Sequence, residues 1–231
     1  MATPEELTAV IDQSDLFDST LREATKDLRI PPGIRNRYSL GLGVVCVEHG
    51  RGIRQLLRVR NTVGAFALFR PQLEALVRQV WIYHCAPEGW IDDFSGDVPE
   101  GSIFEPGSFP DLAAMVADLE RRGRTRESSG FGALLSMLGD SHHSFTHGGL
   151  RAIQNALLGM DTAYEIELVK VSNAVTINAI GQLLVLSKDS GLEAEVWGIA
   201  RQFDGCFLRR DAGHLPDTAP EATPKENAPQ G

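Results

Sequence analysis

Long apolar runs are missing from this chain, because no stretch reaches the roughly 18 uninterrupted apolar residues that a membrane-spanning helix needs. The amino-terminal segment MATPEELTAVIDQ is polar and acidic, unlike the basic and then apolar pattern of a signal peptide. Cysteine is scarce: Cys46, Cys85 and Cys206 stand far apart among apolar neighbours. An odd number at such spacing predicts reduced core thiols and no disulfide framework. We therefore expect a cytoplasmic protein without a membrane partner.

Positive charge is also in deficit, because 31 acidic residues against 22 basic ones give a net charge of -9. Duplex DNA and anionic membranes require a cationic face, so neither partner is expected. The charges are segregated, with a basic block over Arg35–Arg78 and a wholly acidic block over residues 88–120. The two blocks either pair with each other, within one subunit or between two, or leave a cationic face free for an anionic ligand. Within the basic block, Arg51, Arg54 and Arg58 share one helix face, which predicts a solvated face or, alternatively, an RNA- or phosphate-binding stripe.

Strand patterns are nearly absent, and LGVVCVEH is the one β-branched run. Apolar residues instead recur at spacings of three and four, which predicts helices. We expect them over residues 4 to about 29, 34–59, 62–85, 110–120, 131–138, 149–158 and 161–188, with a last one after residue 190. Residues 87–109 are rich in Pro, Gly and Asp and predict a long connection. The expected architecture is an all-α, single-domain bundle of about six or seven helices over residues 1–211, followed by a compositionally disordered tail over 212–231.

Local signals refine this pattern. Thr3 and Glu6 have the spacing of a capping box around Pro4 at the first helical position. Four glycines between residues 41 and 52 indicate either close helix packing or a break in the second helix. Pro71 predicts a kink in the third helix or the start of a new one. Asp161 predicts the N-cap of the longest helix.

Two polar side chains stand beside the apolar stripe of the third helix. Arg70 and Glu74 are four residues apart and so lie on one face. An ion pair at this edge is partly buried, and its desolvation cost demands good partners. The pair is therefore either a structural brace between helices or part of a polar pocket.

Three histidines, His142, His143 and His147, fall within one six-residue segment at a predicted helix junction. In a helix, His143 and His147 project together, but a metal site needs a third ligand and no HExxH arrangement is present. We expect neither a metal nor a cofactor. His147, which precedes a Gly-Gly pair, is then a general acid/base, an anion contact at a helix start, or a hydrogen-bonded junction residue.

The segments FRPQLEALVRQVWIY and SHHSFTHGGLRAI together resemble an uncharacterised family of bacterial all-helical proteins. Their shared features are an Arg-x-x-x-Glu helix that ends in aromatic residues and a downstream Ser-x-x-His-Gly at a helix start. The resemblance covers roughly residues 60–155 and extends to the HEPN superfamily, whose catalytic members are metal-independent ribonucleases of toxin–antitoxin and phage-defence systems. It implies a HEPN-like bundle in which Arg70, Glu74 and His147, with His143 beside them, are the polar site positions.

Two functional hypotheses follow. In the first, the chain is a non-catalytic module that forms a homodimer or binds a protein partner, and its polar positions form a structural network. The resemblance implies a defence or toxin–antitoxin pair as the setting for such a module. In the second, it is a HEPN-type enzyme acting on RNA or another phosphoester, with His147 as acid/base, Arg70 stabilising anionic oxygens and Glu74 orienting one of these groups. The first is favoured, because the sequence contains no complete catalytic set.

Overall fold

The computed structural model describes residues 2–94, 109–123, 145 and 149–208, and these ranges contain eight α-helices and no strand. The all-α prediction is confirmed, with more helices than the six or seven expected. The predicted helix over 131–138 and the predicted tail over 212–231 lie outside the described residues and stay predictions.

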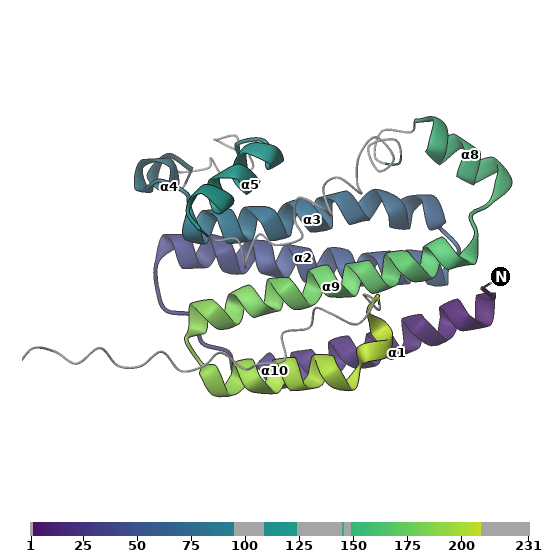
Figure 1. Cartoon of the computed structure of the whole chain (residues 1–231), viewed down its shortest axis with the longest axis horizontal. Coiled ribbons are helices and arrows are strands. Elements are labelled where there is room, and N and C mark those ends of the chain that lie inside the picture. The colour runs from purple at the N-terminus through teal and green to yellow at the C-terminus, as the bar shows by residue number, and fades with distance from the viewer. Residues whose placement is uncertain (1, 95–108, 124–144, 146–148, 209–231) are drawn as a thin grey trace, which may run out of the picture.

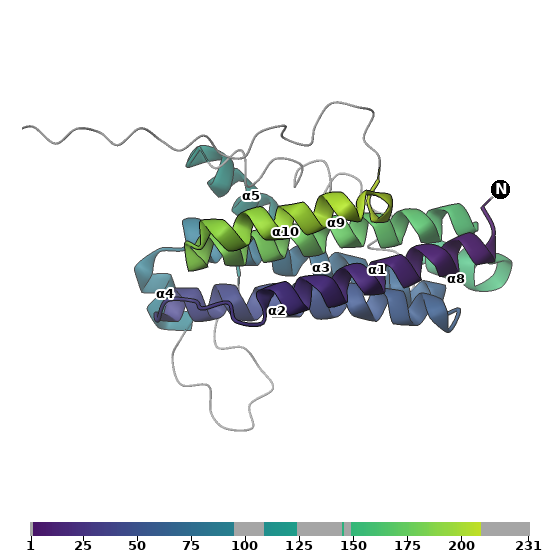
Figure 2. The same cartoon turned by 90° about the horizontal axis from the view of Figure 1, so that it is seen from below.

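Five long helices form an elongated bundle (Figure 1). They are α1 (Pro4–Thr25), α2 (Ile34–Arg58), α3 (Thr62–His84), α9 (Thr162–Ser187) and α10 (Ser190–Gln202). Helices α1, α3 and α9 run in one direction, and α2 and α10 run in the other (Figures 1 and 2). Helix α9 lies at the centre and contacts the other four.

The central position of α9 explains its composition. Among the described residues it is the one helix long and apolar enough to cross a membrane, but 67% of its most apolar window is buried inside the bundle. A helix that is apolar nearly all round needs neighbours on every side, and α9 has them. Helix α9 therefore has the length and composition of a membrane-spanning helix because it is the core helix of the bundle.

Shorter elements lie at the two ends of the bundle (Figure 1). Helices α4 (Glu88–Phe94) and α5 (Leu112–Arg121) lie where α3 ends, whereas α8 (Leu150–Leu158) lies at the opposite end. A 3-10 turn, η1 (Asp204–Cys206), follows α10. The prediction of a long connection over 87–109 is wrong at its start, because α4 forms there. Its Ile91 is fully buried, and its Trp90 packs edge-on against Trp81 with ring centroids 5.0 Å apart.

The predicted helix starts are confirmed by their hydrogen bonds. The Thr3 backbone N–H donates to the Glu6 carboxylate at 2.8 Å, and the Glu6 N–H donates to the Thr3 hydroxyl, which completes the capping box. Asp161 accepts from the Ala163 N–H at 2.9 Å. Helix α3 continues through Pro71 to His84, so the alternative of a new helix at the proline is excluded.

Two buried glutamines of α3 join three helices in repeating layers. The Gln72 side-chain amide donates to the Ser172 carbonyl and the Thr176 hydroxyl of α9, both at 3.1 Å, and its oxygen accepts from the Ser172 hydroxyl. One heptad further along α3, Gln79 donates to the Ala179 carbonyl at 3.0 Å. Both glutamines are fully buried, so these bonds offset the cost of burying the Gln72 amide and the Gln79 amide nitrogen, whereas the Gln79 side-chain oxygen has no hydrogen-bond partner among the described residues.

Glycines of α2 make room for these amides. A Cβ atom at Gly50 would lie 2.8 Å from the Gln72 side-chain nitrogen, and one at Gly43 would lie 2.7 Å from that of Gln79. Of the two explanations for the glycine-rich stretch, close packing is therefore confirmed. Helix α2 runs through it without a break.

The basic face of α2 is paired with α1. Arg51, Arg54 and Arg58 bind a row of three aspartates on α1, namely Asp12, Asp15 and Asp18, at N–O distances of 2.6–2.9 Å. The expectation of a solvated face is wrong, since Arg54 is only 2% exposed. Burial acts to raise the pKa of Asp15, but the hydrogen bonds from Arg58 and Arg54 outweigh it and hold this pKa below its ordinary value.

Among the described residues, Arg51, Arg54 and Arg58 of the basic block are therefore paired with aspartates of α1 and not with the acidic block. One described pair does join the two blocks: Arg35 binds Glu88 at 2.6 Å. The same guanidinium donates to the carbonyl of Ala86 at 2.8 Å and to that of Ile82, just where α3 ends. Arg35 thus caps the carboxyl end of α3, where a cation is favoured.

We predict opposite effects for alanine at two glycines of α2. Gly50→Ala should destabilise the fold by about 1–3 kcal/mol, because the new methyl group would meet Thr176 Oγ1 at 2.7 Å. Gly41→Ala should stabilise it by about 0.4–1 kcal/mol, because nothing lies within 4 Å of a Cβ there and alanine is the better helix former. Urea unfolding followed by circular dichroism measures both. Equal effects of the two substitutions would contradict the close packing at Gly50.

Candidate functional site

The two predicted residues of α3 belong to a row of three charges. Arg70 Nε donates to Glu74 Oε1 at 2.9 Å, and Arg78 Nη2 donates to Glu74 Oε2 at 3.2 Å. Each carboxylate oxygen is therefore occupied by one arginine. The Glu74 side chain is 21% exposed and the two arginines about one third, which confirms the predicted partly buried edge. With one carboxylate and two guanidinium groups, the row carries a net positive charge.

Glu74 and Arg78 line a groove of about 450 Å³ between α2 and α3. The α2 wall consists of Arg37, Tyr38, Gly41, Leu42, Val45 and His49, and the α3 wall of Pro71, Glu74, Ala75, Arg78 and Ile82, with Phe109 at one side. No residue of α9 contributes, so the groove opens on a face of the α2–α3 pair that the central helix does not cover.

Sequence reasoning missed the α2 wall. Tyr38, Gly41, Val45 and His49 recur at spacings of three and four, the signal that would have placed them on one face. Partial burial lowers the pKa of His49, so its imidazole is neutral at pH 7. Across the groove, the Arg78 guanidinium lies over the Phe109 ring, 4.7 Å from its centroid.

The other predicted site residues, His143 and His147, lie outside the described residues. Phe145, which stands between them in the sequence, is described: it is buried and stacks on Phe66 of α3 with ring centroids 5.1 Å apart. Phe66 precedes Arg70 by one helical turn. The structure thus brings Arg70 and Glu74 together, and it leaves their relation to the two histidines as a prediction.

The described residues offer no group of three His, Cys, Asp or Glu side chains that could hold a metal ion. The three cysteines are free and buried, as predicted for core thiols. Burial raises the pKa of the Cys46 thiol, so this group is protonated and poorly nucleophilic. The chemistry available in the groove is therefore that of guanidinium, imidazole, phenol and one carboxylate.

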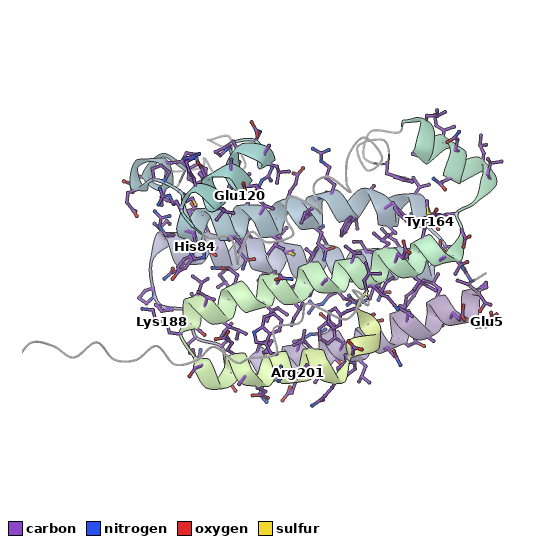
Figure 3. The ribbon with its side chains drawn as sticks, in the orientation of Figure 1. Glu5, His84, Glu120, Tyr164, Lys188 and Arg201 are labelled. Carbon is purple, nitrogen blue, oxygen red and sulfur yellow. The ribbon has the colours of Figure 1, made fainter. Side chains whose placement is uncertain are left out.

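A second surface feature is the apolar face of α8. Leu150, Ile153 and Leu157 follow one another at spacings of three and four, and each is more than half exposed. Leu158 extends this face and is 85% exposed. We call these four residues the α8 stripe. Tyr164, at the start of α9, is exposed beneath α8 at the same end of the bundle, opposite His84 (Figure 3).

Comparisons with known proteins give one result. A family model described as a family of unknown function, DUF6988, matches residues 43–209, which include most of α2, all of α3 and the α8 stripe. No curated protein matches the chain. No solved structure matches it either. Because this family model matches well over half of the length of the chain, the chain belongs to the DUF6988 family.

Proposed function

We propose that this protein is a non-catalytic, partner-binding helical module whose first partner is a second copy of itself. The observation that supports this proposal is the α8 stripe. An amphipathic helix ordinarily turns its apolar face toward the core. In α8 only Ala152 is buried among the apolar side chains, and the four larger ones face solvent.

Charge favours a second copy as the occupant. A chain with a net charge of -9 repels its own copies over most of its surface. Among the described helices, α8 alone contains no Asp or Glu, and its single charged residue is Arg151. Two copies related by a twofold axis therefore meet at α8 with the least repulsion, and an apolar stripe is complementary to itself.

The size of the surface sets the strength of the interaction. A stable interface buries roughly 800 Å² on each partner, and one nine-residue helix supplies only part of this area. We expect a dimer that dissociates in the micromolar range. In this proposal Arg70, Glu74 and Arg78 brace α3 as a structural row. The free thiols fit the proposed cytoplasmic location, where cysteines stay reduced.

Leu157→Lys should convert the dimer to a monomer while the fold survives. Leu157 is 78% exposed, so little packing is lost, and a cation near the carboxyl end of α8 suits the helix dipole. Sedimentation equilibrium over a range of concentrations measures the association. The matched control is Leu16→Lys, at a leucine of α1 that is 59% exposed and belongs to no apolar stripe. A wild-type chain that stays monomeric at high concentration, or a Leu157→Lys chain that still dimerises, would contradict the proposal.

A second candidate function is phosphoester cleavage of the HEPN ribonuclease type. The observation in its favour is Phe145: this residue separates His143 from His147 in the sequence and stacks on the same helix that carries Arg70 and Glu74. His147 would act as acid/base, Arg70 would stabilise an anionic oxygen, and Glu74 would orient one of these groups. A place in a toxin–antitoxin or phage-defence pair rests on the sequence resemblance alone.

His147→Ala separates the two candidates. If the site is structural, the melting temperature should fall, and neither wild type nor variant should cleave RNA. If it is catalytic, the variant should keep the wild-type melting temperature and lose RNA cleavage or cell toxicity. We expect the first result.

A further inference from the structure

We propose that the groove between α2 and α3 binds a small amphipathic anion, a molecule with an aromatic or alkyl body and a carboxylate, sulfonate or phosphate group. This inference is independent of the dimer proposed above, because none of the residues that line the groove belongs to α8. Its volume of about 450 Å³ lies within the range of small-molecule pockets, roughly 300–1,000 Å³.

The charges of the groove select an anion. Arg37 stands on the α2 wall with an exposed side chain and makes no ion pair within the part of the chain that the structure describes. Arg78 stands on the α3 wall and has one carboxylate partner, Glu74, which it shares with Arg70. The two arginines that line the groove and Glu74 sum to a charge of +1 in a chain whose total is -9. Guanidinium groups bind carboxylate and phosphate oxygens in paired hydrogen bonds.

The remaining lining selects the body of the ligand. Leu42, Val45, Ile82 and Phe109 offer apolar contacts within the groove, and the Arg78 guanidinium lies over the face of the Phe109 ring. His49 is neutral at pH 7 because its pKa is lowered, and so it offers a hydrogen bond and no further charge. An inorganic ion would leave this apolar lining uncovered. A neutral apolar molecule would leave the exposed Arg37 guanidinium without a carboxylate partner among the described residues.

Gly41 supplies the means to block the groove without disturbing the bundle. It lines the α2 wall, and a Cβ atom there would meet nothing within 4 Å. A phenylalanine at this position would project into open space. Gly198 of α10 is the matched control, because it also lies within a helix, also has nothing within 4 Å of a Cβ, and does not line the groove.

The probe is anilinonaphthalene sulfonate, an aromatic anion whose fluorescence rises when it leaves water. We expect saturable binding to the wild-type chain, loss of that binding in Gly41→Phe, and no change in Gly198→Phe. Arg37→Gln should weaken binding about tenfold, the size expected for loss of one charge-assisted contact. Circular dichroism melting establishes that each variant is folded, and Arg37→Gln removes no ion pair among the described residues, so its fold is not at risk.

Phenylnaphthylamine, which has a similar aromatic body without the sulfonate, tests whether the anion matters. We expect it to bind more weakly than the sulfonate and to be insensitive to Arg37→Gln. Equal binding of the two probes would overturn the proposal, since the groove would then be an apolar surface. Full binding by Gly41→Phe would also overturn it, because the probe would then lie elsewhere, for example on the α8 stripe. Repeating the titration with Leu157→Lys, which should bind as the wild type does, identifies that location.

Discussion

The rest of the fold depends on two amide side chains that cross from α3 to α9 over glycines of α2. Gln72 and Gln79 are seven residues apart, as are Gly50 and Gly43 on α2 and the carbonyls of Ser172 and Ala179 on α9. A slip of α2 along α3 would place a side chain where the amide now lies, and would leave two buried amides without partners. The layers therefore fix the register of three helices at once. The Gln72 side chain makes three hydrogen bonds and the Gln79 side chain one. The Gln79 side-chain oxygen is buried without a partner among the described residues. The Gln72 layer therefore contributes more to fixing the register.

This constraint also determines which surfaces remain for function. Because the glutamines hold α9 on one side of the α2–α3 pair, the other side is left with a groove that Arg37 and Arg78 make cationic. The arginines further along α2 are unavailable there, since α1 neutralises them with Asp12, Asp15 and Asp18. Helix α8 stands at the end of the bundle, beyond these layers, with its apolar stripe exposed. The surfaces available for binding are thus the helix faces that do not pack in the core.

Local signals predicted the helices well, and tertiary contacts accounted for what the sequence did not show. Some signals act within a few residues and can be recognised in a single segment of the sequence. They are the capping box at Thr3, the N-cap at Asp161 and the apolar spacing of α3. The pairing of Arg51, Arg54 and Arg58 with α1 joins residues that are more than thirty positions apart in the sequence, and periodicity within α2 cannot distinguish it from a solvated face. Arg70 and Glu74 were found because four-residue spacing predicts contact. The sequence did not predict Arg37, Tyr38 and His49 as site residues, because they form the groove only when α2 packs against α3.

The most direct test of the glycine–glutamine layer is a double-mutant cycle on Gly43 and Gln79. In the wild-type background, Gly43→Ala should lower the free energy of unfolding by about 1–3 kcal/mol, because its methyl group would lie 2.7 Å from the Gln79 side-chain nitrogen. In the Gln79→Ala background that contact is gone and only the 3.2 Å approach to the flexible Leu183 side chain remains, so the same substitution should cost clearly less. The expected coupling energy is about 1 kcal/mol or more. Urea unfolding of the four chains measures it. If Gly43→Ala costs the same in both backgrounds, the Gln79 amide does not need the space left by a glycine at position 43. That result would contradict the account.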